Sequence, residues 1–211
     1  MLEIQLNLIS AVAIFLAAVV PVYLTLRLQG NLRKLTLLLS VFILTHAIFH
    51  ITGFLGFNFL AEGVFEPISV AVLIFFGIAF SGFSSRTSKM NMRSLAAAWT
   101  PATSVLFIMS NITIILLLVA LGIFAWLAVR SKNVRSFQFQ MSIFLIVWIL
   151  GEITGYLQDS GIVIFPSLQG DIGLEIHTAS MIFFSVLLWL RFFYSERSGK
   201  KIVEDLDANL R

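Results

Sequence analysis

Few ionisable side chains stand inside or beside the long apolar stretches of this 211-residue chain. Those that stand out are His46, His50, Glu66, Glu152, Glu175 and His177. Burying an ionisable group in a membrane is costly, so each of them is a functional candidate by default. Imidazole nitrogens combined with carboxylate oxygens suit Zn²⁺, Cu²⁺, Fe²⁺ or Mn²⁺. We therefore predict that these residues form a transition-metal site.

The spacing of His46 and His50 is that of two ligands on one helix. Residues four apart lie on the same helical face, so both imidazoles point the same way. The same groups can also transfer protons, because histidine titrates near neutrality. The structural alternative is that His46, His50 and Glu152 hydrogen-bond neighbouring helices, while Glu66 and Glu175 are ordinary acids at helix starts.

Several other cofactors and reactions are disfavoured. The chain has no cysteine, which removes iron–sulfur clusters, thiolate metal sites and disulfides. It has no phosphate-binding loop, dinucleotide fingerprint or hydrolase motif, so we expect no nucleotide cofactor. Haem is not expected either, because two axial histidines must face each other across one porphyrin, and His177 is predicted to lie nearer the surface than His46.

The composition is that of a chain whose solvent is lipid. Hydrophobic residues make up 59% and charged residues 12%, with a mean hydropathy of +0.98, whereas soluble domains carry about 25% charged residues. We predict an all-α integral membrane protein of the plasma membrane, and we expect its helices to contact the lipid bilayer directly. The net charge is +3, and the basic residues lie in short loops between the apolar runs. Their simpler role is to orient the chain in the membrane, so we do not expect nucleic-acid binding.

The apolar runs predict seven membrane-spanning helices. Five are plain, and two more come from dividing the stretch between Ser94 and Val129 at the polar pair Ser110 and Asn111. The predicted ranges are 6–26, 35–57, 67–83, 94–110, 111–129, 137–157 and 172–193. The fourth contains Pro101, and its alternative is an interfacial or re-entrant segment.

Lysine and arginine decide the number of helices and their orientation. Basic residues in short loops stay on the cytoplasmic side of a membrane. With seven helices and the N-terminus outside, all 14 basic residues lie at the cytoplasmic side. Six helices would instead place Arg130, Lys132 and Arg135 opposite the first two basic clusters. We therefore predict seven helices, with the C-terminus inside.

The chain also contains an internal repeat. Aligning Asn31 with Asn133 places Arg33, Ser40, Phe42, Ile51, Thr52, Gly53 and Leu55 on Arg135, Ser142, Phe144, Ile153, Thr154, Gly155 and Leu157. In this alignment His50 matches Glu152. We predict two parallel three-helix repeats joined by a linker helix, a 3+1+3 plan. Its parts are residues 1–93, 94–110 and 111–194, followed by an amphipathic cytoplasmic tail, 195–211.

Three functions remain open. The first is an outward-facing site that binds a transition-metal ion or a proton-coupled small solute and transports it. The second is a sensory or scaffold subunit of a membrane complex, or of a homo-oligomer, that signals through the tail. The third is a metal-dependent membrane enzyme or its accessory subunit. Because no catalytic motif occurs, the first two are favoured over the enzyme.

Overall fold

The computed structural model describes residues 2–84, 105–131, 133–160 and 172–198. These residues are helical, without a strand among them. The helices are α1 (Leu2–Arg27), α2 (Gly30–Phe54), α3 (Asn58–Leu60), the π-helical turn η1 (Ala61–Phe65), α4 (Glu66–Ser84), α5 (Val105–Arg130), α6 (Phe137–Asp159) and α7 (Ile172–Ser198). Among the described residues, six helices are long and apolar enough to cross a membrane. The described part of the chain is therefore all-helical, and the protein is a multi-pass membrane protein.

Helices are the structure that such a sequence must adopt in lipid, because every backbone polar group has to be satisfied inside its own segment. Hydroxyl side chains follow the same rule. Thr45 and Thr52 donate to the carbonyl oxygens of Val41 and Ile48, one turn earlier on α2. The polar residues of the apolar helices thus cost little, and they leave the helices intact.

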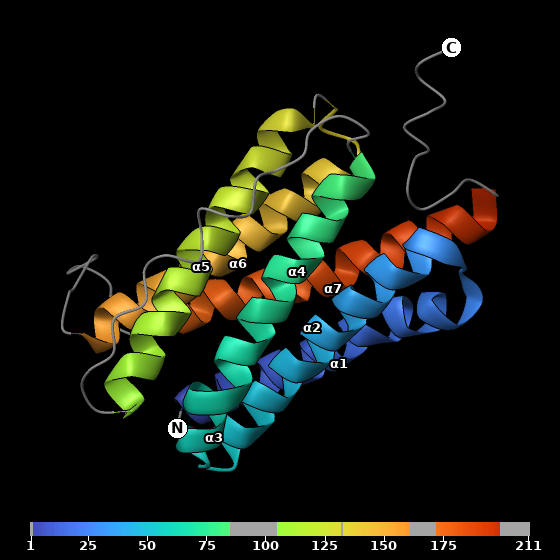
Figure 1. Ribbon diagram of the computed structural model, residues 1–211. Helices are drawn as coiled ribbons and strands as arrows, with labels where there is room; N and C mark the ends of the chain where they lie inside the picture. Colours follow the sequence, from blue (N-terminus) through green and yellow to red (C-terminus); the bar gives the residue numbers. More distant parts are fainter. Residues whose placement is uncertain (1, 85–104, 132, 161–171, 199–211) are drawn as a thin grey trace.

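The six long helices form a closed ring. Each packs on the next in the order α1, α2, α4, α5, α6 and α7, and α7 returns to α1. Figure 1 shows the helices side by side in this arrangement. A ring of six helices has an interior, and side chains from all of them meet there.

The helices α4 and α5 run in the same direction, as Figure 1 shows. Near their starts, the side chains of Glu66 on α4 and Thr113 on α5 both hydrogen-bond Tyr156. Farther along, the ring of Phe76 on α4 stacks on that of Phe124 on α5. The end of α4 and the start of α5 therefore lie at opposite ends of the bundle.

The two ends of the bundle carry opposite charge. One end, called the basic end here, holds every described lysine and arginine: Arg27, Arg33, Lys34, Arg130, Arg135, Arg191 and Arg197. The opposite end, called the acidic end, is where α2 and α6 finish and α4 and α7 begin. Its described acids include Glu62, Glu66, Glu152 and Glu175.

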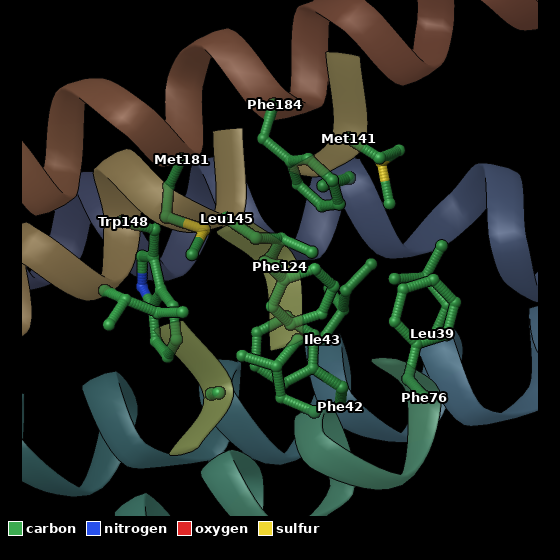
Figure 2. Packing of buried hydrophobic residues seen from close by; sticks show 14 of the residues in the cluster. Leu39, Phe42, Ile43, Phe76, Phe124, Met141, Leu145, Trp148, Met181 and Phe184 are labelled. Atoms are coloured by element: carbon green, nitrogen blue, oxygen red, sulfur yellow. The ribbon is translucent and has the colours of Figure 1, made fainter. Parts of the chain in front are cut away.

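Large apolar side chains fill the interior between these ends (Figure 2). The labelled members are Leu39, Phe42, Ile43, Phe76, Phe124, Met141, Leu145, Trp148, Met181 and Phe184, and all are buried. Phe42 and Trp148 meet edge to face, with ring centroids 5.5 Å apart. This apolar layer closes the middle of the ring.

The predicted helix break at Ser110 and Asn111 is wrong. One helix, α5, runs without interruption from Val105 to Arg130. Polar residues lower helix propensity by well under 1 kcal/mol, whereas a turn inside lipid would leave several backbone groups without partners. The last residues of the predicted helix 94–110 therefore belong to α5, and its other residues, up to 104, lie outside the described part of the chain.

Other predicted boundaries are displaced at the ends. The second helix begins at Gly30 rather than at 35 and ends at Phe54 rather than at 57. The third membrane span begins before Pro67, because the turn η1 leads into α4 directly. Of the predicted tail, α7 takes the residues up to Ser198, and the remaining residues lie outside those described.

Candidate metal centre

Three imidazole groups from two helices meet in the interior of the helix bundle, at its acidic end. His46 and His50 project from one face of α2, as their spacing predicts, and His177 projects from the second turn of α7. The Nε2 atom of His177 lies 3.2 Å from Nε2 of His46 and 2.8 Å from Nε2 of His50. All three residues are buried, with at most 2% of their surface exposed.

The spacing of the three nitrogens suits one ion. Ligand nitrogens about 2.05 Å from a tetrahedral Zn²⁺ stand about 3.3 Å from each other. The nitrogens of His46 and His177 lie 3.2 Å apart, and those of His50 and His177 2.8 Å apart. The ligand atoms of all three histidines lie within 4.8 Å of one another. The cluster therefore has the composition and nearly the size of a three-histidine metal centre.

Glu152 on α6 holds His177 from the other side of its ring. Its Oε1 lies 2.5 Å from Nδ1 of His177 and 3.8 Å from Nε2 of His46. The side chain of Glu152 is only 13% exposed. The carboxylate and the imidazole are therefore in direct contact inside the bundle. Carboxylate, histidine and metal are the usual order of partners in metal centres.

Ser69 on α4 orients His46 in the same way. Its hydroxyl donates to the backbone carbonyl of Glu66 over 2.7 Å. Because the single hydroxyl hydrogen is used there, the Ser69 oxygen accepts from Nδ1 of His46, 3.3 Å away. We assign this tautomer from the hydrogen-bond network. The Nε2 of His46 then carries a lone pair and no hydrogen.

The Nε2 atom of His177 is the centre of the cluster, with the Nε2 atoms of His46 and His50 on either hand at 3.2 Å and 2.8 Å. The tautomer that Ser69 sets leaves the Nε2 of His46 with a lone pair for a cation. A metal ion bound to the three nitrogens would replace the contacts among the rings.

A second polar group lies next to the histidines. The phenol of Tyr156 on α6 donates to the carboxylate of Glu66 and accepts from the hydroxyl of Thr113. Glu66 is 3% exposed, and it follows the π-helical turn η1 directly. A π-turn changes the direction of the residues beyond it and is frequent at functional sites. Here it brings Glu66 and Ser69 to the interior of the ring.

Aromatic rings enclose the cluster from the direction of the core. The indole of Trp148 meets the ring of His46 edge to face, with centroids 5.0 Å apart, and lies 5.7 Å from that of His177. Phe42 stacks on His46 from one turn below. In Figure 2, Trp148 lies beside Leu145 and Met181. These rings exclude water from the inner side of the site.

Five of the six predicted residues come together in this region, and Glu175 does not. Glu175 lies in the first turn of α7 and is exposed. A shift of two residues along a helix turns a side chain by about 200°, so Glu175 and His177 point to opposite faces of α7. His177 was also predicted to lie nearer the surface than His46. The rings of the two residues are in contact, and both residues are buried.

The sequence prediction missed three residues around the cluster: Ser69, Trp148 and Tyr156. Trp148 and Tyr156 stand one turn before and one turn after Glu152, so the helical period places them on the same face of α6. Trp148 is also the counterpart of His46 in the repeat alignment. These signals were legible in the sequence, whereas the contact of Ser69 with His46 depends on how α4 packs on α2.

No protein-family model, curated protein or solved structure matches this chain.

Proposed function

We propose that this membrane protein holds one transition-metal ion at its acidic end. His46, His50 and His177 supply the ligands through their Nε2 atoms, Ser69 fixes the tautomer of His46, and Glu152 supports His177 from the other side of its ring. The observation that carries the proposal is the convergence of three buried imidazoles, whose ligand atoms lie within 4.8 Å of one another. Three neutral imidazoles favour Zn²⁺ or Cu²⁺ over harder ions.

The ion is a resident of the site and not a passenger. A transported ion needs further polar ligands along its path, because an unpaired charge in an apolar interior is strongly disfavoured. The interior next to the cluster is lined by Phe42, Trp148 and Leu145, all buried and apolar. This layer weighs against the transport hypothesis and supports permanent binding.

Metal-dependent catalysis is the second candidate function. Three histidine ligands leave one tetrahedral position open, which is the pattern of catalytic zinc sites. The carboxyl of Glu66 and the phenol of Tyr156 form a hydrogen-bonded pair close to the cluster, and such pairs serve as proton donors and acceptors. The sensory alternative depends on the tail, whose residues beyond Ser198 lie outside those described.

Elemental mass spectrometry of detergent-purified protein tests the metal site. We expect about one zinc or copper per chain in the wild type and less than a tenth of that in His46→Ala and in His177→Ala. Glu175→Ala is the matched control, since it removes a predicted ligand two residues from His177 that is exposed. Purification without chelators that yields metal-free wild type, or equal metal in His177→Ala, would contradict the proposal.

We propose in addition that the basic end faces the cytoplasm of the cell that carries this protein in its plasma membrane. The charge of the seven described basic residues at one end supports this orientation. The common direction of α4 and α5 also supports the predicted seven crossings and the 3+1+3 plan.

The order of the ring supports the repeat. Exchanging α1 with α5, α2 with α6 and α4 with α7 leaves every neighbour in the ring unchanged. Thr52 and Thr154, which match in the alignment, each donate to the carbonyl oxygen four residues earlier. His50 and Glu152, which also match, both contact the ring of His177.

Labelling of single cysteines tests the orientation, and the chain has no native cysteine to interfere. Cysteines at Gln29 and Asn133 should react only after the cytoplasmic side is opened, and one at Phe57 should react from outside in intact cells. All three positions are exposed. Reaction of the first two from opposite sides would refute the parallel arrangement of the repeats.

A further inference from the structure

A cavity of about 440 Å³ lies at the basic end of the bundle, in the half of the ring away from the histidines. Its walls come from the last turns of α1, α4 and α7 and from the first turns of α2 and α6. Leu39 on α2 forms part of its inner wall, and His46 lies about two helical turns farther along the same helix. The cavity and the metal centre are therefore separate sites on opposite sides of the apolar layer.

The wall of the cavity is apolar. Leu35, Leu39, Phe80 and Leu188 line it, and all four are buried side chains. The hydroxyl of Thr36, a polar group in the wall, donates to carbonyl oxygens of its own helix. The wall thus offers contact area and few free hydrogen-bonding groups, which suits a hydrocarbon chain and not a sugar, nucleotide or ion.

The mouth of the cavity is charged. Arg27, in the last turn of α1, and Glu196, near the end of α7, line it and lie 3.5 Å apart. Both side chains are more than half exposed, so this ion pair is weak and open to exchange. The charged residues described at this end are seven lysines and arginines and one acid, Glu196. The mouth therefore opens at an end of the bundle where the described charge is positive, which is suited to a negatively charged group.

We propose that this cavity binds one acyl chain of an anionic phospholipid, whose phosphate lies beside Arg27. An apolar wall whose mouth opens at the basic end of the bundle has the same order of properties as such a lipid, hydrocarbon first and phosphate last. The volume falls in the range of specific ligand pockets, roughly 300–1,000 Å³. The position at the helix ends also matches the depth at which lipid headgroups lie.

Native mass spectrometry of the full chain in detergent tests this site. The probes are phosphatidylglycerol, phosphatidylcholine with the same acyl chains, and inorganic phosphate. We expect one tightly held phosphatidylglycerol per chain, bound several-fold more tightly than phosphatidylcholine, and no displacement by inorganic phosphate. Displacement by phosphate alone would mean that the acyl chain is not held, and would overturn the proposal.

Variants that fill the cavity provide the second arm. Leu24→Trp places an indole in the wall and should lower phosphatidylglycerol affinity at least ten-fold, while Leu26→Trp, two residues away and facing outward at 79% exposure, should not. Thr36→Phe fills the cavity from α2 and serves if Leu24→Trp does not fold. Each filled variant should also melt at a higher temperature in lipid-free detergent. Equal lipid retention by the filled and control variants would refute the site.

The headgroup is tested at the mouth. Arg27→Gln should reduce the preference for phosphatidylglycerol over phosphatidylcholine by about five-fold, the effect of one basic residue at a membrane surface. Arg33→Gln removes an equal charge that does not line the cavity and should leave the preference within two-fold of the wild type. An equal loss in both variants would show a general effect of surface charge and would contradict a phosphate site at Arg27.

Discussion

Replacing Glu152 by glutamine should weaken metal binding without abolishing it. The carboxylate oxygen lies 2.5 Å from Nδ1 of His177, and the side chain of Glu152 is 13% exposed, so the contact is largely shielded from water. Loss of an outer-shell partner costs about 10- to 100-fold in metal affinity. Because glutamine keeps an oxygen at this position and leucine does not, we expect about ten-fold for Glu152→Gln and about 100-fold for Glu152→Leu.

The assay is a competition titration of purified protein against a chromophoric zinc chelator, with the fold followed by gel filtration and circular dichroism. Glu175→Gln is the control, because it removes one carboxylate from an exposed position on the neighbouring helix. The reasoning is refuted if Glu152→Leu binds zinc as tightly as the wild type. It is also refuted if Glu175→Gln weakens binding as much as Glu152→Gln does.

Ser69→Ala should lower zinc affinity by up to ten-fold, since His46 loses the acceptor that sets its tautomer. Ser180→Ala, whose hydroxyl also donates to a carbonyl oxygen three residues earlier, should leave affinity unchanged in the same titration. Gly173→Ala should lower the melting temperature and the metal content together, because its Cβ would overlap the backbone of Gly155 and separate α7 from α6; overpacking of this kind costs about 1–3 kcal/mol. Gly122→Ala, which meets nothing within 4 Å, is the control, and equal melting temperatures for the two variants would contradict this packing. Wild-type protein in liposomes should not raise zinc uptake above that of empty liposomes, and a protein-dependent flux lost with the metal ligands would restore the transport hypothesis.

Gly173 also shows how the site depends on close packing. Without a side chain, Gly173 lets α7 approach the backbone of α6 at Gly155 and Gly151. This approach sets the height of His177 against Glu152. The repeat alignment singles out Gly155, but no local pattern identifies its partner.

The helical nature of the chain and part of the site follow from local sequence. Apolar runs of spanning length must become helices in lipid, and the spacing of four residues places His46 and His50 on one face of α2 whatever that helix packs against. Matching His50 with Glu152 also selects two residues that contact the same ring, that of His177. These features depend on periods and on solvent, which are properties of the sequence itself.

Only the tertiary structure decides the rest. The exposed position of Glu175, the contact of Ser69 with His46 and the continuation of α5 through Ser110 do not follow from any period in the sequence. The rotation and the height of one helix against another are set by packing between residues far apart in the chain. Since a helix turned by half a revolution keeps the same local hydrogen bonds, its own sequence does not favour either rotation, and the neighbouring helices determine which side chains meet.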